Sequence, residues 1–203
     1  MTMRPRWHFV AVSIALLIGV VLVLHNAASV YPPQRHADGA GPLASRDGPG
    51  HEMLAVDPAR DTTSWTYGMR LCLTNGSTEA TIESVGPTRS VGDGFRQLGA
   101  VIREFTPSPI DTPIIGVAGY PPPSSFVPDT MSAVRGFEVR TPCADAEPDA
   151  PYTELLVGLG IVNEVGGGWD GVDVHYTSQG RAFVLSVQRQ LFICGTAIEA
   201  KCA

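Results

Sequence analysis

Hydrophobic and polar residues alternate along several short segments in the second half of the chain. The clearest segment spans 152–161, where the apolar residues of one face are Leu155, Val157, Leu159 and Ile161. A repeat of two residues is that of a β-strand, whose side chains point alternately to its two faces. Residues 172–177 and 182–187 repeat this pattern around Gly180, a residue suited to the tight turn of a hairpin. The pattern therefore predicts antiparallel strands.

Seven β-prone segments, each bounded by turn residues, follow residue 66, and no segment has a convincing helical repeat. They are MRLCL, ATIESV, QLGAVIREF, GFEVR, YTELLVGLGIV, GVDVHYT and RAFVLSVQRQLFIC. This pattern predicts a mainly β fold, an antiparallel immunoglobulin-like β-sandwich over residues 65–203, with a small barrel as the alternative.

Residues 106–134 interrupt the predicted strands with seven prolines. Proline cannot donate a backbone hydrogen bond, so this segment is incompatible with a central strand. We expect it to be either an ordered loop draped over the sandwich or a mobile insertion.

Residues 7–24 carry no formally charged side chain and follow Arg4 and Arg6. As a helix they would be roughly 27 Å long, close to the thickness of the hydrocarbon core of a bilayer. Positive charge on this side alone predicts a single-pass anchor over residues 1–25, with a cytoplasmic N-terminus and an extracytoplasmic remainder. The alternative is a cleaved signal peptide, which would release a secreted protein.

Residues 26–64 are rich in Pro, Gly, Asp and Ala and show no sustained hydrophobic repeat. Such a composition buries too little apolar surface to order a chain, so we predict a flexible stalk. The rest of the 203 residues suffices for one folded domain of ordinary composition, with 44% hydrophobic and 17% charged residues in the whole chain.

The formal net charge is −6, and lysine and arginine do not cluster in the predicted domain. Nucleic-acid binding needs clustered positive side chains that displace phosphate counterions. We therefore expect no nucleic-acid partner. The expected partners are the membrane, through residues 7–24, and an envelope protein.

The chain has four cysteines, Cys72, Cys143, Cys194 and Cys202, and no Cys-x-x-C motif. An extracytoplasmic location favours disulfides, and four cysteines allow three pairings. We expect at least one structural disulfide between two of the first three cysteines. Cys202 either stays free or pairs with its near neighbour Cys194.

Candidate catalytic residues are few. His175 is the single histidine between Tyr67 and the C-terminus, so a histidine-activated nucleophile would have to use it. The chain lacks the short motifs of serine hydrolases, zinc proteases and nucleotide-binding loops. Paired carboxylates are the enzymatic alternative, with the candidates Glu138, Glu154, Glu164, Asp170 and Asp173. We expect neither an enzyme nor a cofactor.

The stretch GGGWDGVDVHY, residues 166–176, contains the densest group of reactive side chains. Asp170, Asp173 and His175 are weak candidates for a divalent-cation site, because no further ligand is evident. The simpler interpretation is a strand whose valines and Tyr176 face the core, while Asp173 and His175 face water.

Trp169 follows three glycines and precedes Asp170-Gly171, which predicts a loop position. Its indole either folds over the end of the core as a lid or stays exposed as a contact for a partner.

Four segments resemble a loose group of uncharacterised exported proteins from high-GC Gram-positive bacteria. They are RLCLTNGSTEATIESVGP, YTELLVGLGI, GVDVHYTSQGRAFVLSV and LFICG, and the resemblance spans about residues 67–195. It implies a single-pass anchor followed by a small β-sandwich, and it implies no activity.

These features predict a membrane-anchored extracytoplasmic binding or interaction module. One alternative is an envelope hydrolase that uses carboxylates or His175. The other is a structural subunit of a membrane complex.

Overall fold

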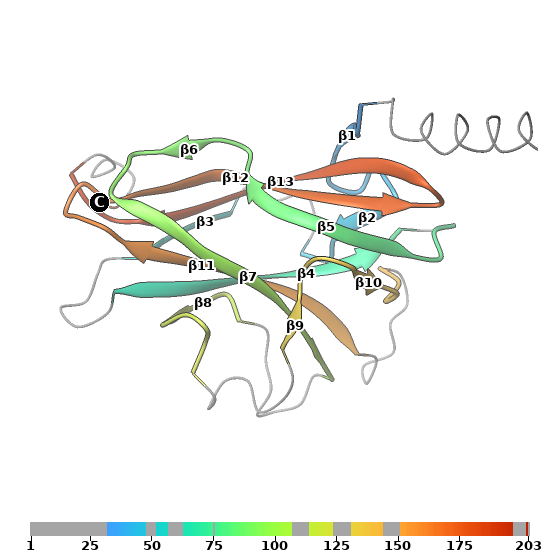
Figure 1. Cartoon of the computed structure of the whole chain (residues 1–203), viewed down its shortest axis with the longest axis horizontal. Coiled ribbons are helices and arrows are strands. Elements are labelled where there is room, and N and C mark those ends of the chain that lie inside the picture. The colour runs from blue at the N-terminus through green and yellow to red at the C-terminus, as the bar shows by residue number, and fades with distance from the viewer. Residues whose placement is uncertain are drawn as a thin grey trace, which may run out of the picture.

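The computed structural model of the chain describes residues 32–47, 52–56, 63–74, 76–106, 114–123, 131–143, 151–196 and Cys202. The thirteen elements in these residues, β1 to β13, are all strands (Figure 1). The predicted mainly β class is therefore confirmed. Within the same residues no helix is long and apolar enough to cross a membrane. The predicted anchor, residues 1–25, lies outside the described part of the chain.

The strands form two sheets, here called sheet A and sheet B. Sheet A runs in the order β1 (Gln34–Ala37), β13 (Arg181–Ile193), β12 (Gly167–Ser178), β5 (Ala80–Pro87) and β10 (Phe137–Val139). Two further strands join it, β3 (Glu52–Val56) beside β13 and β6 (Ser90–Val91) beside β12. Most neighbours are antiparallel, but β1 and β3 both pair with β13 in parallel.

Sheet B is entirely antiparallel among its named strands. It runs in the order β2 (Leu43–Ser45), β4 (Ser64–Leu73), β11 (Tyr152–Ile161), β7 (Phe95–Phe105) and β9 (Ser132–Ala133), and β8 (Gly116–Ala118) pairs with β4. The two sheets lie one above the other as two layers (Figure 1).

A single hydrophobic core fills the space between the layers. Leu155, Val157 and Leu159 enter it from sheet B, as the alternation in the sequence predicts. From sheet A it receives Val172, Val174, Tyr176, Leu185 and Val187. Because alternate residues of these long strands share one face, a local repeat is enough to define both sides of the core.

The predicted flexible stalk, residues 26–64, is wrong for three segments that form β1, β2 and β3. Leu43 of β2 is fully buried, and its neighbours pair with the end of β4. Such short strands are held by backbone hydrogen bonds to the edge of a longer strand, so they need no sustained hydrophobic repeat of their own. Residues 26–31, 48–51 and 57–62 of this range lie outside the described residues.

Within the predicted proline-rich segment, residues 114–123 lie along the edge and the outer face of sheet B, away from the core, whereas residues 131–134 include β9 and Val134, which packs into the core. Strand β8 pairs there with β4, and Ile114 packs against Leu156. Tyr120 lies over Gly158, where an added Cβ would come within 2.2 Å of its ring. Of the two alternatives, the draped loop is thus confirmed for these residues. Residues 107–113 and 124–130 lie outside the described part.

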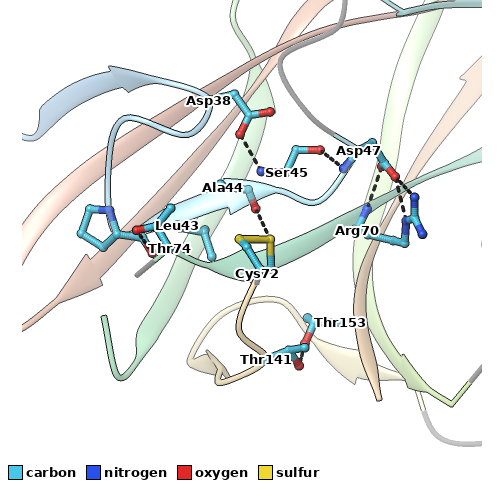
Figure 2. The surroundings of a disulfide bond; sticks show 12 residues. Asp38, Leu43, Ala44, Ser45, Asp47, Arg70, Cys72, Thr74, Thr141 and Thr153 are labelled. Atoms are coloured by element: carbon cyan, nitrogen blue, oxygen red, sulfur yellow. Dashed lines mark hydrogen bonds and ion pairs between the residues drawn. A yellow bond between two sulfur atoms is a disulfide. The ribbon is translucent and has the colours of Figure 1, made fainter. Parts of the chain in front are cut away.

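Both cysteine pairs are disulfides, Cys72–Cys143 and Cys194–Cys202. Figure 2 shows the first of them at the end of β4, with Ala44 of β2 on one side and Thr141 and Thr153 on the other. The expected disulfide among the first three cysteines is confirmed. For Cys202, the structure selects pairing with Cys194 over a free thiol.

Candidate functional site

The predicted polar residues of β12 gather on the outer face of sheet A. Asp170 and Asp173 are three positions apart, a spacing that would put them on opposite faces of a regular strand. A β-bulge between Asp170 and Val172 changes this, because the pairing with β13 shifts register there. Gly171 permits the bulge with its φ of 100°. Both carboxylates therefore project from the same face.

Asp173 is the best-connected carboxylate on this face. Arg35 of β1 donates from Nη1 to both carboxylate oxygens, at 2.8 and 2.7 Å. Thr88 Oγ and Ser186 Oγ each donate to Oδ1 at 2.8 Å. The partners come from three separate stretches of chain that meet because β1 and β12 both pair with β13.

The environment of Asp173 keeps it ionised. Burial alone would raise the pKa of Asp173, but hydrogen bonds from Thr88, Arg35 and Ser186 outweigh burial and hold the pKa below its usual value. A carboxylate with a low pKa and four donor contacts is a poor general base. Its chemical role is to fix the groups around it, above all the Arg35 guanidinium.

Asp170, three positions earlier in β12, is also bound by an arginine. It accepts hydrogen bonds from Arg89 Nη2 and from Gln190 Nε2 of β13. The Arg89 side chain is 70% exposed, whereas that of Asp170 is 17% exposed. For Arg35 and Asp173 the corresponding values are 55% and 7%. On this face the arginines are thus outermost, and the carboxylates lie beneath them.

An open position lies beside this pair of contacts. Gly86 of β5 pairs with Asp173, and a Cβ added at Gly86 would meet no atom within 4 Å. We call the surface formed by Arg35, Arg89, Asp170, Asp173 and Gly86 the arginine face.

The structure separates the three weak metal candidates by their contacts. Asp170 and Asp173 pair with arginines, and His175 is half-buried on the same face. The expectation that Asp173 faces water is wrong, because Arg35 from the predicted stalk covers it. Among the described residues, no group of three or more His, Cys, Asp or Glu side chains could hold a metal ion.

Trp169 belongs to β12, so the predicted loop position is wrong. Its side chain is 1% exposed and lies in the core between the sheets. The preceding glycines serve close packing within the sheet: a Cβ on Gly168 would lie 1.9 Å from the carbonyl oxygen of Leu191. The lid hypothesis predicted a buried indole, and the indole is buried. It is buried because Trp169 lies in a strand, however, and not because a loop folds over the end of the core. The alternative role as an exposed contact is excluded by this burial.

The other candidate carboxylates lie elsewhere. Glu154 is buried on the outer face of sheet B, where Arg103 Nε donates to Oε2 at 2.9 Å and the Ile114 amide donates to Oε1 at 2.6 Å. Glu138 is exposed and paired with Arg140. The core separates Glu154 from Asp170 and Asp173, so no paired-carboxylate site forms between them.

Sequence reasoning missed the partners of Asp173. Arg35 lies in a four-residue strand within a segment of stalk-like composition, and Thr88 follows the end of β5. Neither belongs to a recognisable motif. The single signal available was the odd spacing of Asp170 and Asp173 around Gly171, which is typical of a bulge.

Comparison with protein family models, with curated proteins and with solved structures finds no match to the chain.

Proposed function

We propose that the protein is a membrane-anchored extracytoplasmic binding module built on an immunoglobulin-like sandwich. The order of the long strands supports this fold: β4-β11-β7 in one sheet and β13-β12-β5 in the other. Numbered along the chain, this is the order B-E-D and G-F-C of an immunoglobulin domain. The pairing of β2 with β4 corresponds to that of strand A with strand B.

The disulfides support a location outside the cytoplasm. Two disulfides that use all four cysteines are typical of proteins that fold in an oxidising compartment. The uncharged span of residues 7–24 behind Arg4 and Arg6 supports export with retention at the membrane. The resemblance to exported proteins of Gram-positive bacteria favours the same location.

The arginine face is the observation that carries the binding function. Arg35 and Arg89 are each fixed by a carboxylate beneath them while more than half of each side chain stays exposed. Arginine is enriched among the residues that dominate interface energetics, and a side chain held in place loses less entropy on binding. A rigid, exposed pair of arginines is therefore better suited to recognition than to proton transfer.

A steric probe at Gly86 tests this function. In Gly86→Tyr, a bulky side chain enters the open position of the arginine face. Gly116→Tyr is the matched control. A Cβ added at Gly116 would also meet no atom within 4 Å, and Gly116 belongs to β8, which pairs with β4 of sheet B. Both variants should fold with melting temperatures near that of the wild type.

The measurement is cross-linking of the full-length anchored proteins in their membrane, followed by affinity capture and mass spectrometry. We expect one set of partners to be captured by the wild type and by Gly116→Tyr, and lost with Gly86→Tyr. Equal capture by all three proteins would contradict a binding role for this face.

A reporter that is active only outside the cytoplasm, fused after Ala203, should be active, and an inactive fusion would contradict the proposed location.

A further inference from the structure

We propose that the arginine face recognises carboxylate groups of an acidic protein segment, with Arg35 and Arg89 as the two gripping residues. The proposal rests on the binding function above and specifies the chemistry of the partner.

The donors of the two arginines are only partly used. Arg35 donates to described residues through Nη1 alone, and Arg89 through Nη2 alone. A guanidinium has five N–H donors in a planar fork. The remaining edge of each fork makes no hydrogen bond within the described part of the chain. It therefore has the geometry to bind a planar carboxylate through two parallel hydrogen bonds.

The positive charges on this face lie closer to the surface than the negative charges, which favours an anionic partner. Asp170 and Asp173 lie under the guanidinium groups, so a partner meets positive charge first. A cationic side chain would have to displace an arginine to reach either carboxylate. Gln190 and Ser186 further occupy the aspartates through hydrogen bonds. The face therefore offers donors to an acid and few accessible acceptors to a base.

The number and placement of the cations favour carboxylates over a phosphate polymer. The two arginines are bound to positions 170 and 173 of one strand, and the chain as a whole carries a net charge of −6. Nucleic acid needs a broad cationic surface, which a chain of this charge does not favour. Two separated forks on an acidic molecule match two carboxylates of a short peptide segment.

The test uses the full-length chain in detergent micelles and a fluorescein-labelled oligoglutamate peptide as the probe. Fluorescence anisotropy should detect binding that weakens as salt is added. Oligoglutamine of the same length should not bind. Arg89→Gln should weaken oligoglutamate binding by about tenfold or more, as for the loss of a charge-assisted pair of hydrogen bonds.

Arg35→Gln should weaken binding similarly, but it also leaves Asp173 without its cation. Arg35→Lys keeps the charge, so it should fold and still bind more weakly than the wild type because it lacks the fork. Arg181→Gln is the matched control: Arg181 is an exposed arginine at the start of β13. It should bind oligoglutamate like the wild type.

Three results would overturn the proposal. They are absence of oligoglutamate binding to the wild type, equal weakening by Arg181→Gln, and tighter binding of inorganic phosphate than of the peptide in competition. If the membrane capture still depends on Gly86 while oligoglutamate fails to bind, the binding function stands and the acidic partner is wrong. If both fail, the proposed function is wrong as well.

Discussion

Trp169 owes its position to two nearby glycines, Gly168 directly before it and Gly171 two residues after it. Gly168 lets β12 approach the backbone of β13, and Gly171 forms the bulge that resets the alternation. The indole is therefore directed into the core, while Asp170 next to it faces outward. A run of glycines around an aromatic residue reads as a loop in the sequence, but here it permits close contact between strands.

Replacing Trp169 by alanine should strongly destabilise the fold, because it leaves a large cavity between the sheets. We expect the free energy of unfolding to fall by about 3–5 kcal/mol, as for other buried aromatic side chains. Denaturant titration measures this change. Val162→Ala is a suitable control, because Val162 is mostly exposed and should change stability by less than about 0.5 kcal/mol. An unchanged midpoint for Trp169→Ala would contradict the core position.

At the scale of elements, a buried acid holds residues 114–123 against sheet B. Glu154 accepts a hydrogen bond from the Ile114 amide and pairs with Arg103 across to β7. A few residues along β11, Gly158 leaves space for the Tyr120 ring. The segment is thus held by the buried contact of Glu154 at one end, by the pairing of β8 with β4, and by the Tyr120 ring over Gly158 at the other end.

The Glu154 contact predicts a pH dependence of stability. Burial raises the pKa of Glu154 to about 6, although Arg103 and the Ile114 amide act in the opposite direction. The native state then binds a proton more tightly than the unfolded state, whose glutamate has a pKa of about 4.3. This group alone should make the free energy of unfolding decrease by about 2 kcal/mol as pH rises from about 4.3 to 6.

Denaturant titrations across that pH range, for the wild type and Glu154→Gln, isolate the effect. The variant should be less stable at neutral pH, because the buried Arg103 guanidinium loses the negative charge of Glu154. In the variant, the free energy of unfolding should also no longer show the decrease with rising pH that Glu154 causes in the wild type. Glu138→Gln, at an exposed carboxylate, should keep that slope. Identical slopes for all three proteins would show that Glu154 does not titrate in this range.

For the whole molecule, the two disulfides differ in how much chain they constrain. Cys72–Cys143 closes a loop with a sequence separation of 71, which includes β5, β7 and the segment over sheet B. Cys194–Cys202 has a separation of 8 and ties only the end of the chain. In the chain-entropy model, stabilisation grows with the logarithm of the loop length.

Removing the long-range disulfide should therefore cost more. We expect the double variant Cys72→Ala/Cys143→Ala to lose about 4 kcal/mol and Cys194→Ala/Cys202→Ala about 2.5 kcal/mol of stability. Thermal or denaturant unfolding of the exported proteins provides the comparison. A larger loss for the short loop would contradict the entropic ranking. Thiol counting in denatured wild-type protein should find no free cysteine.

The sequence by itself determined the local features of this protein. The two-residue repeat around Leu155, Val157 and Leu159 defined the strand and the residues that face the core between the sheets, because alternation is a property of the strand alone. The four cysteines, in a chain with an export-like N-terminus, predicted disulfides because disulfides form in oxidising compartments. The same alternation in the other β-prone segments indicated the mainly β class.

Only the tertiary structure decided what meets across the chain. Arg35 reaches Asp173 across 138 positions because β1 adds to the edge of β13, and a four-residue strand carries no signal of its own. The cysteine pairing, the burial of Trp169 and the cover of residues 114–123 over Gly158 depend in the same way on which strand edges and faces were left open. The periodicity of a strand depends on local sequence alone. The order of strands in a sheet depends on which distant segments pair with each other, and this pairing brings the residues of the arginine face together.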